Sequence, residues 1–399
     1  KACKQWRIVA YKTYYTRRML MLNIKKGISD SNNIEQAIIE VIDQIKQNNV
    51  KLVIFFANYK YDFKKINEAF NTVFSGIELI GCTSHGEIGV PGGYGEGYLL
   101  GISIASDNFN VASAVIKDLD TRAMLSKSEV MAAIHKVGLD PEHNDLINQG
   151  FALSIIDGLS RSEEKAMSLL NIIFKRKNFR LVGGSAGALI SNPVAFISHN
   201  GRIYTNAAII TFVKTSHKFT IIKENIYEAT GRTFIVTKAD MNNRIVSELN
   251  GRTAADVYAE ALGVNRSEIV TKHFAYNPAG RVFGKNVFIT SPYSILNDGS
   301  LQFYSQIMTG ATIRFMKPLD PLTVAEQTAA QIKAEVPNAK LILGFNCLLR
   351  HIQFENDQIT SKAYDIVNSA GTFTGSISLG EQYDMYHVNQ TLTLLALGE

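Results

Sequence analysis

Apolar residues recur at helical spacing from Asn33 onward and alternate with short apolar runs. The first stripe, residues 34–45, predicts an amphipathic helix, and the run at 51–57 predicts a buried strand. A second stripe at 63–74 and a second run at 77–82 repeat this order. Because helices lie between buried strands, the pattern predicts crossover connections and a largely parallel sheet in this part of the chain.

The pattern changes after the glycine-rich turn at residues 91–97, where the runs 98–105 and 109–116 follow each other without a helix. Antiparallel pairing is expected there. Downstream we expect helices at 123–137, 162–174, 243–249, 254–262 and 322–335, with Thr253 as the N-cap of the fourth. We expect strands at 151–157, 219–227, 287–290, 301–305, 312–315, 340–345, 371–379 and 388–397, and a hairpin over 194–213 that turns at Asn200-Gly201.

Two stretches of the chain, Gly81–Glu87 and Gly375–Glu381, share the sequence motif G-x-x-S-x-G-E. Each ends an apolar run, and glycine lets another backbone or a ligand come close. We therefore expect Glu87 and Glu381 at strand ends, where open α/β sheets bind ligands. The repeat predicts an α/β fold, mixed α+β, of two related halves with mixed sheets covered by helices and a ligand cleft between the halves. The alternative is two tight turns, each capped by a carboxylate.

The composition is that of a soluble protein long enough for two domains, with 399 residues, 46% hydrophobic and 19% charged. No apolar stretch approaches the roughly 20 residues that span a bilayer, and the start lacks the apolar segment of a signal peptide. We therefore expect no membrane span and a cytoplasmic location. The three cysteines have no C-x-x-C spacing, which argues against a disulfide framework or a cysteine-based zinc site.

Positive charge is concentrated at the start of the chain. Residues 1–20 hold six lysines and arginines and no acid, so the rest of the chain has a net charge of −1 out of the total of +5. A broad nucleic-acid surface is therefore not expected. We expect residues 1–20 to be a basic leader that is disordered or not native, rather than an arm that binds nucleic acid or a membrane surface.

Several motifs together resemble the FIST proteins. They are G-C-T-S-x-G-E-I-G at 81–89, G-G-S-A-G at 183–187, F-N-C-L-L-R at 345–350, and G-E-Q at 380–382 before H-V-N-Q-T at 387–391. The resemblance implies a FIST N-terminal domain at 21–217 and a FIST C-terminal domain at 218–399. The last two motifs are most similar to bacterial nitric-oxide-sensing haemoproteins of this family. That similarity implies haem b, a nitric oxide signal, and an intracellular partner that is a sensor histidine kinase or a cyclic-di-GMP enzyme.

Haem iron in a gas sensor requires an imidazole ligand. His387 is the first choice, because Asn389 and the polar residues after it could orient its second nitrogen. His85 is the second choice, since it departs from the usual family residue beside the first Gly-Glu turn. Arg350 could bind a haem propionate. The open alternatives are that His387 only stabilises the Glu381 turn and that Arg350 pairs with an internal acid.

Other functions compete with haem sensing. The same fold could sense a small metabolite such as an amino acid through Arg350, Glu381 and Asn389, or it could be a protein-interaction scaffold. Ser185 lies in a G-x-S-x-G motif, but a hydrolase elbow needs a helix directly after the serine, and residues 188–193 predict none. We therefore expect a protein that is not an enzyme. A homodimer is left open.

Overall fold

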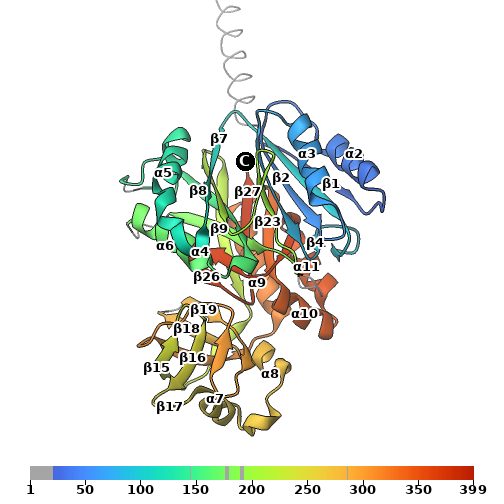
Figure 1. Ribbon diagram of the computed structural model, residues 1–399. Coiled ribbons are helices and arrows are strands. Elements are labelled where there is room, and N and C mark those ends of the chain that lie inside the picture. Colours follow the sequence, from blue (N-terminus) through green and yellow to red (C-terminus); the bar gives the residue numbers. More distant parts are fainter. Residues whose placement is uncertain (1–20, 144, 176–178, 189–192, 285) are drawn as a thin grey trace, which may run out of the picture.

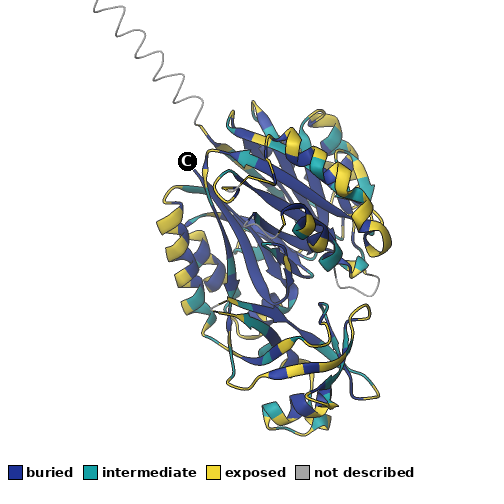
Figure 2. Cartoon of the chain, turned by 90° about the vertical axis from the view of Figure 1, so that its left-hand side faces the viewer, coloured by how far each residue is buried: buried dark blue, intermediate teal, exposed yellow. Residues whose placement is uncertain are grey.

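The computed structural model describes residues 21–143, 145–175, 179–188, 193–284 and 286–399. The expected basic leader at 1–20 lies outside the described residues. Figure 1 shows a body built around several sheets and a smaller lobe below it, with the C-terminus at the end of the body away from the lobe. Figure 2 shows that the sheets form the buried centre, whereas the helices expose their outer faces.

One order of elements occurs three times in the body: strand, helix, strand, helix, strand, a short hairpin and a closing strand. The first unit consists of β1 (Asn23–Ser29), α2 (Ile34–Ile45), β2 (Val50–Asn58), α3 (Phe63–Val73), β3 (Glu78–Ser84), β4 (Glu87–Ile88), β5 (Tyr94–Gly95) and β6 (Leu99–Ala105). The second consists of β7 (Phe109–Ile116), α4 (Leu119–Arg122), η1 (Ala123–Ser126), α5 (Lys127–Lys136), β8 (Gly150–Asp157), η2 (Gly158–Ser160), α6 (Glu163–Ile173), β9 (Arg180–Ala186), β10 (Ile197–His199), β11 (Arg202–Tyr204) and β12 (Ala208–Thr215).

The third unit is interrupted after its first strand. It consists of β13 (Lys218–Asn225), α9 (Pro321–Glu335), β23 (Ala339–Cys347), α10 (Leu348–Asn356), α11 (Thr360–Asn368), β24 (Gly371–Ser378), β25 (Glu381–Tyr383), β26 (Tyr386–Val388) and β27 (Thr391–Gly398). Side-chain caps fix where several of these helices begin. Asn33, Asp62 and Asp320 each accept hydrogen bonds from backbone N–H groups in the first turn of α2, α3 and α9.

The three units share one strand order. The sheets run β1-β6-β2-β3, β7-β12-β8-β9 and β13-β27-β23-β24. In each order, the last two strands are joined through a helical crossover and are parallel. The second strand in each order is the closing strand of its unit, and it is antiparallel to both of its neighbours. The sheets are therefore mixed, rather than largely parallel, because the closing strand inserts between the first strand and the parallel pair.

Each unit gives its short hairpin to another unit. The β4–β5 hairpin of the first unit pairs with β24 of the third, and the β25–β26 hairpin of the third pairs with β9 of the second. The β10–β11 hairpin of the second pairs with β3 of the first. This exchange closes a ring, so that each sheet is completed by residues from a different unit.

The inner faces of the three sheets form one hydrophobic core. It joins Ile54 and Phe56 of the first unit, Leu153 of the second, and Leu343 and Phe345 of the third. The outer face of each sheet has its own core, shared with the helices of that unit. The apolar strands are thus buried on both faces, which explains why they read as continuous apolar runs rather than as alternating patterns.

Residues 227–318 form the lobe below the body in Figure 1, which we call the insertion lobe. It enters and leaves the body at one point, where the Leu319 backbone N–H donates to the Ile226 carbonyl at 2.9 Å. Its elements are β14 (Tyr227–Ala229), β15 (Phe234–Asp240), β16 (Ile245–Leu249), β17 (Arg252–Thr253), α7 (Ala254–Leu262), η3 (Arg266–Glu268), α8 (Thr271–Tyr276), β18 (Ala279–Phe283), β19 (Asn286–Thr290), β20 (Pro292–Ile295), β21 (Leu301–Phe303) and β22 (Thr312–Pro318).

The α/β class, with mixed sheets covered by helices, is confirmed. The body contains three related units rather than the two related halves that we expected, because the same strand order occurs three times. The expected helix at 243–249 is wrong: Ile245–Leu249 is strand β16, which pairs with β15, β17 and β21. Strand pairing within the lobe overrides the helical spacing of its apolar residues. Thr253 is at the N-cap of α7, but its side chain makes no capping hydrogen bond.

Candidate functional site

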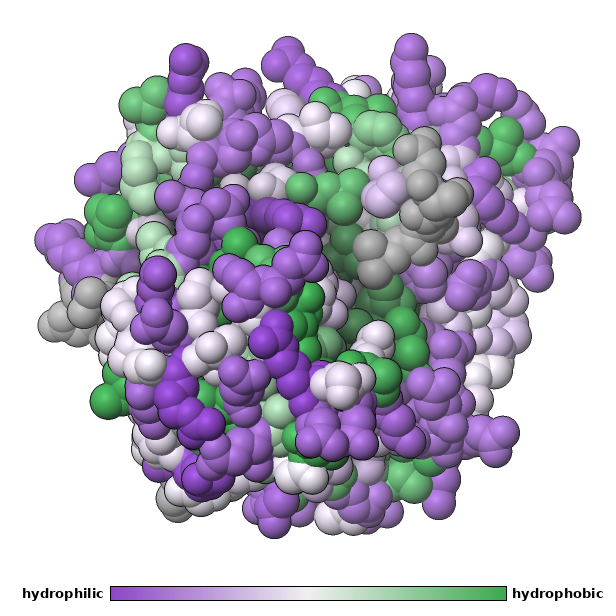
Figure 3. Space-filling model, turned by 60° about the horizontal axis from the view of Figure 1, so that its bottom comes forward, coloured by the Kyte–Doolittle hydropathy of each residue, from purple (hydrophilic) through white to green (hydrophobic). Residues whose placement is uncertain are grey.

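A small cavity of about 140 Å³ lies where the second unit, the third unit and the insertion lobe meet. It lies at the carboxyl ends of β8, β23 and β24, the edge at which open α/β sheets bind ligands. Figure 3 views the molecule from the lobe side and shows a hollowed surface with hydrophobic residues inside it. The lining residues of the cavity are Gly158, Leu159, Arg161, Glu163, Arg244, Tyr293, Phe303, Tyr304, Cys347, Leu348, Leu349, Leu379 and Asn389.

A buried ion pair joins the lobe to the body at this cavity. Arg244, from the turn before β16, donates through Nη2 to Glu163 Oε2 at 2.6 Å and to Glu164 Oε2 at 2.7 Å. Both glutamates lie in the first turn of α6, where the helix dipole favours negative charge. The Arg244 and Glu163 side chains are only 7% and 3% exposed, so each requires the other as a partner.

Behind Glu163 lies a group of polar side chains from the second and third units. Ser185 Oγ donates to Glu163 Oε1 at 3.1 Å and accepts from Gln382 Nε2 at 3.0 Å. Gln382 Nε2 is also 3.5 Å from Nδ1 of His387, whose Nε2 lies 4.0 Å from Glu163 Oε1. The exchanged β25–β26 hairpin supplies both Gln382 and His387, so the exchange itself brings this group together.

Charge compensation keeps Glu163 ionised. Burial alone raises the pKa of a carboxyl group, but electrostatic interactions with His387 and Arg244 outweigh it and hold the pKa of Glu163 below its ordinary value. Glu163 therefore serves as a fixed anion between the lobe arginine and the hairpin histidine. Ser185 is occupied by Glu163 and Gln382, and among the described residues no histidine forms a hydrogen bond with its hydroxyl, which is not the arrangement of a serine nucleophile.

Two buried donors that line the cavity have no hydrogen-bond partner in the described structure, Arg244 Nε and Asn389 Nδ2. Asn389 is 1% exposed, and its Oδ1 accepts from the Ser291 backbone N–H at 3.3 Å. An unpaired buried donor costs free energy comparable to a lost hydrogen bond. These two unpaired donors make the cavity the candidate site for a group that accepts hydrogen bonds.

The two Gly-Glu turns have the same local geometry, with both carboxylates fully buried. Glu87 accepts from Ser84 Oγ and from the Tyr98 backbone N–H at 3.3 Å. Glu381 accepts from Ser378 Oγ at 2.8 Å and from the Thr391 backbone N–H at 3.2 Å. The turns are thus equivalent corners that fix the exchanged hairpins, and neither carboxylate is among the residues lining the cavity.

His85 has different neighbours from His387. Its Nε2 lies 3.5 Å from Glu96 Oε1, and its ring stacks on Tyr59 with centroids 6.2 Å apart. The neighbouring His351 packs on Tyr94, and burial together with the charge of His85 lowers the pKa of His351 to about 4. This group lies between the first and third units, whereas His387 lies between the third unit and α6 of the second.

Arg350 also lies outside the cavity. It is 1% exposed and donates to Asn346 Oδ1 and Glu224 Oε1, both buried. Its guanidinium lies 4.3 Å from the centre of the Phe354 ring. The structure thus places Arg350 in an internal ion pair, the alternative to a propionate ligand that the sequence left open.

The residues at this cavity do not fit haem. The cavity beside His387 has about the volume of an engineered cavity that binds benzene, roughly 150 Å³, and is smaller than the roughly 300 Å³ at which drug-sized sites begin. Both ring nitrogens of His387 face protein groups, Glu163 and Gln382. Among the described residues, no three His, Cys, Asp or Glu side chains are arranged to hold a metal ion.

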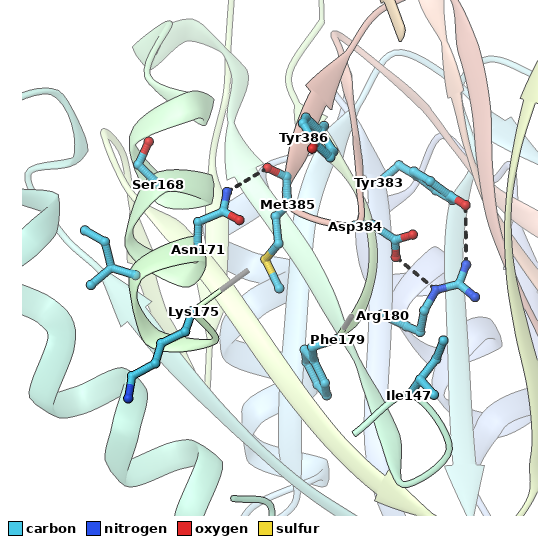
Figure 4. Close-up of a pocket in the computed structure, with 11 residues that line it drawn as sticks. Ile147, Ser168, Asn171, Lys175, Phe179, Arg180, Tyr383, Asp384, Met385 and Tyr386 are labelled. Atoms are coloured by element: carbon cyan, nitrogen blue, oxygen red, sulfur yellow. Dashed lines mark hydrogen bonds and ion pairs between the residues drawn. The ribbon is translucent and has the colours of Figure 1, made fainter. Parts of the chain in front are cut away.

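A larger groove of about 960 Å³ lies on the outside of the second unit (Figure 4). Its charged groups are paired: Arg180 Nε donates to Asp384 Oδ1 at 3.0 Å, and Lys175 pairs with Glu142 at 2.7 Å. Arg180 begins β9, so the groove lies at the amino end of that strand. The smaller cavity is the stronger candidate, because it has unpaired buried donors and lies at the carboxyl end of the parallel strands.

Of the predicted site residues, Asn389 lines the smaller cavity, and His387 lies behind Glu163, which also lines it. Glu163 and Arg244 were missed. The acidic pair Glu163-Glu164 at the start of a predicted helix could have indicated a site. The signal is not specific, however, because the helix dipole favours acidic residues in the first turn of any helix. Arg244 gave no local signal, since its partner Glu163 is 81 residues away in the sequence.

Comparison with known families identifies the chain. Residues 51–252 match the FIST N domain and residues 254–384 match the FIST C domain. The comparison with curated proteins gave no match. The predicted boundary at 217–218 stays a prediction. In the described part of the chain, no helix is long and apolar enough to cross a membrane. FIST domains are sensory domains of signal-transduction proteins, and this chain belongs to the FIST family.

Proposed function

We propose that the chain is a sensory protein that binds a small polar ligand in the cavity between the body and the insertion lobe. The observation that carries the proposal is that two residues lining this cavity, Arg244 and Asn389, each have a buried donor without a partner, Nε and Nδ2 respectively. One donor belongs to the lobe and the other to the third unit. A ligand that accepts from both would connect them, and the position of the lobe would then report occupancy.

A thermal-shift screen tests the proposal. A ligand that binds only the folded state must raise the melting temperature, by an amount that grows with its concentration. The screen contains amino acids, short organic acids and haem, and it compares the wild-type chain with Asn389→Ala. Asn242→Ala is the matched control, because Asn242 is exposed in a lobe turn. We expect a hit that Asn389→Ala loses and Asn242→Ala retains; a screen without any hit would contradict the proposal.

Haem b, nitric oxide and a partner histidine kinase or cyclic-di-GMP enzyme stay predictions from the family resemblance. Absorption spectra of the chain with added haem test the first two. A Soret band that shifts with nitric oxide and is lost in His387→Ala would favour haem sensing over the small-ligand proposal, and would require the groups around His387 to rearrange.

A further inference from the structure

The class of the ligand can be inferred from the cavity, an inference that rests on the proposed function. We infer that the ligand is a small monocarboxylate with a short apolar body and no ammonium group. Its carboxylate would be held between Arg244 Nε and Asn389 Nδ2. The lobe and the body would thereby be bridged through one ligand group.

The first argument is the type of the unpaired atoms. Among the described residues that line the cavity, the buried side-chain atoms without a partner are both N–H donors. Arg161, also in the lining, is exposed and adds a second guanidinium. Guanidinium and amide N–H groups form their strongest hydrogen bonds to anionic oxygens. A carboxylate has two anionic oxygens, one for each of the two unpaired donors.

The second argument is the state of the acceptors. Glu163 Oε1 accepts from Ser185 and Oε2 from Arg244. Glu164 Oε2 also accepts from Arg244, and Oε1 accepts from the Gln306 backbone N–H at 2.7 Å. An ammonium group would have to compete for oxygens that already receive a donor. The arrangement therefore favours an organic acid over the amino acid with the same carbon skeleton.

The third argument is the shape and lining of the remaining space. Leu348, Leu349 and Leu379 contribute apolar surface, and Phe303 lies in the same wall. A volume of about 140 Å³ is close to that of the engineered cavity that binds benzene, roughly 150 Å³. The non-carboxylate part of the ligand is therefore limited to a short branched chain or a single ring.

The extra negative charge is compensated within the site. A bound carboxylate would join Glu163 and Glu164, giving three anions near Arg244. Arg161 stands at the same cavity, and His387 lies within ion-pair distance of Glu163, 4.0 Å from Nε2 to Oε1. The guanidinium of Arg244 keeps its two glutamates through Nη2 and receives the ligand at Nε, so the bond between lobe and body is kept.

Calorimetric titration of the full chain with three matched probes tests this inference. The probes are 3-methylbutanoate, valine and 3-methylbutan-1-ol, which share a branched carbon skeleton and differ in the ammonium or the carboxylate. We expect 3-methylbutanoate to bind about ten- to hundredfold more tightly than either of the others, the effect of one or two charge-assisted hydrogen bonds. Benzoate serves as the single-ring probe, and binding of either acid at this advantage supports the inference.

Two variants locate the binding. Asn389→Asp replaces the unpaired donor with an anion of the same size and is expected to weaken 3-methylbutanoate binding at least about tenfold. Arg161→Gln is expected to weaken it less, since Arg161 is exposed. A melting temperature near that of the wild type shows that the variants are folded.

The outcomes separate the inference from the proposed function. If valine binds as tightly as 3-methylbutanoate and Asn389→Ala abolishes its binding, the cavity is a ligand site and the exclusion of an ammonium group is wrong. If 3-methylbutan-1-ol binds as tightly as 3-methylbutanoate, the carboxylate inference is wrong. If acids bind equally well to Asn389→Asp, the inference is also wrong. If no compound in the screen or the titrations binds to the folded chain, both the inference and the proposed function are contradicted.

Discussion

Gly97, Asn206 and Gln390 occupy the same place in the three units, two residues after the exchanged hairpin ends, and all three have left-handed backbone with φ of 84°, 48° and 50°. This conformation costs a residue other than glycine roughly 1 kcal/mol or more. In the second and third units this position is not a glycine, so the backbone is strained there. The side chains at this position form hydrogen bonds: Asn206 donates to Asp120, and Gln390 donates to the Tyr227 hydroxyl. The backbone path of the hairpin exchange is therefore conserved within the molecule, although the residue types differ.

The two buried glutamates of the Gly-Glu turns predict how stability depends on pH. Burial raises the pKa of both Glu87 and Glu381 from 4.5 to about 8. Between these values the folded chain holds protons that the unfolded chain releases, so the free energy of unfolding must fall as pH rises. The expected slope is on the order of 1.4 kcal/mol per pH unit for each group. Urea unfolding at about pH 5.5 and about pH 7.5 measures it.

Glu381→Gln and Glu87→Gln provide the matched comparison. Each removes one titrating group but keeps the size and the acceptor oxygen, so each is expected to make the fall in stability over this pH range shallower. An unchanged pH slope in both variants would show that the two carboxyl groups do not titrate in this window.

The Arg350–Glu224 pair predicts a large effect on stability, because both side chains are at most 1% exposed. Arg350→Met leaves Glu224 buried without its cation and is expected to cost roughly 3–5 kcal/mol of unfolding free energy. The double variant Arg350→Met/Glu224→Gln is expected to recover part of that loss. Arg252→Met is the control, since its pair with Glu260 is exposed and is worth less than about 1 kcal/mol. Equal losses in the double variant and in Arg350→Met would count against this explanation.

At the scale of elements, the three parallel strand pairs require glycine at the same register. Gly81, Gly183 and Gly375 pair with Phe55, Ser154 and Gly344 of the neighbouring strand. A Cβ built on Gly375 would lie 1.9 Å from the Gly344 carbonyl oxygen, and one on Gly183 would lie 2.1 Å from the Ser154 carbonyl oxygen. Glycine thus allows close backbone approach just before the strands end at the exchanged hairpins.

Gly375→Ala is therefore expected to destabilise the chain by more than about 2 kcal/mol, because the backbone oxygen of a central strand cannot move aside easily. Gly231→Ala is the control, since no atom of the described residues lies within 4 Å of a Cβ at that position. Thermal unfolding followed by circular dichroism measures both. If the Gly375→Ala chain has the same melting temperature as the Gly231→Ala chain, the close-packing explanation is wrong.

The exchanged hairpins also place one residue of their second strand against another unit. His387 lies beside Glu163 of α6, Tyr94 packs on His351 of α10 with ring centroids 3.9 Å apart, and Ile203 packs against the outer core of the first unit. The same junction is charged in one place, aromatic in another and apolar in the third. His387 is therefore a substitution within a structural repeat, and its charged partner is what separates it from the other two copies.

Periodicity predicted the elements that pack by simple rules. The sequence predicted helices α2, α3 and α9, because each has an apolar stripe and a capping residue. It predicted the buried strands because each is a continuous apolar run. Strand β16 was misread because only its pairing in the lobe sheet distinguishes it from a short helix. The hairpin exchange could not be predicted, since strands of two residues such as β4 carry no periodicity and pair with strands far away in the sequence.

At the scale of the whole molecule, the site was only partly accessible from the sequence. The motif ending in H-V-N-Q-T located His387 and Asn389, because polar residues are conspicuous between two apolar strands. The lobe side of the cavity could not be predicted, since Arg244 and Tyr304 come from loops and Tyr293 from the short strand β20, and the positions of all three depend on the folding of the lobe. Long-range contacts, rather than local patterns, build this half of the site.

The ring of exchanged hairpins predicts that the halves of the chain do not fold separately. Residues 21–217 alone would lack β25–β26 beside β9, and their own β4–β5 hairpin would lack β24. We expect this fragment to be digested rapidly by protease and to show no cooperative melting. Mixing it with residues 218–399 is expected to restore protease resistance and cooperative melting. Cooperative melting of the fragment alone at the temperature of the full chain would contradict the prediction.

The position of the last strands has a consequence for synthesis on the ribosome. β27 lies between β13 and β23, and β25–β26 completes the sheet of the second unit, so residues 381–398 finish two of the three sheets. Until they emerge, the nascent chain carries apolar strands with open edges, which favour aggregation. Native folding must then wait until residues 381–398 have left the ribosome. Loss of residues 381–398 would leave both sheets unfinished, although every other strand of these sheets would still be present.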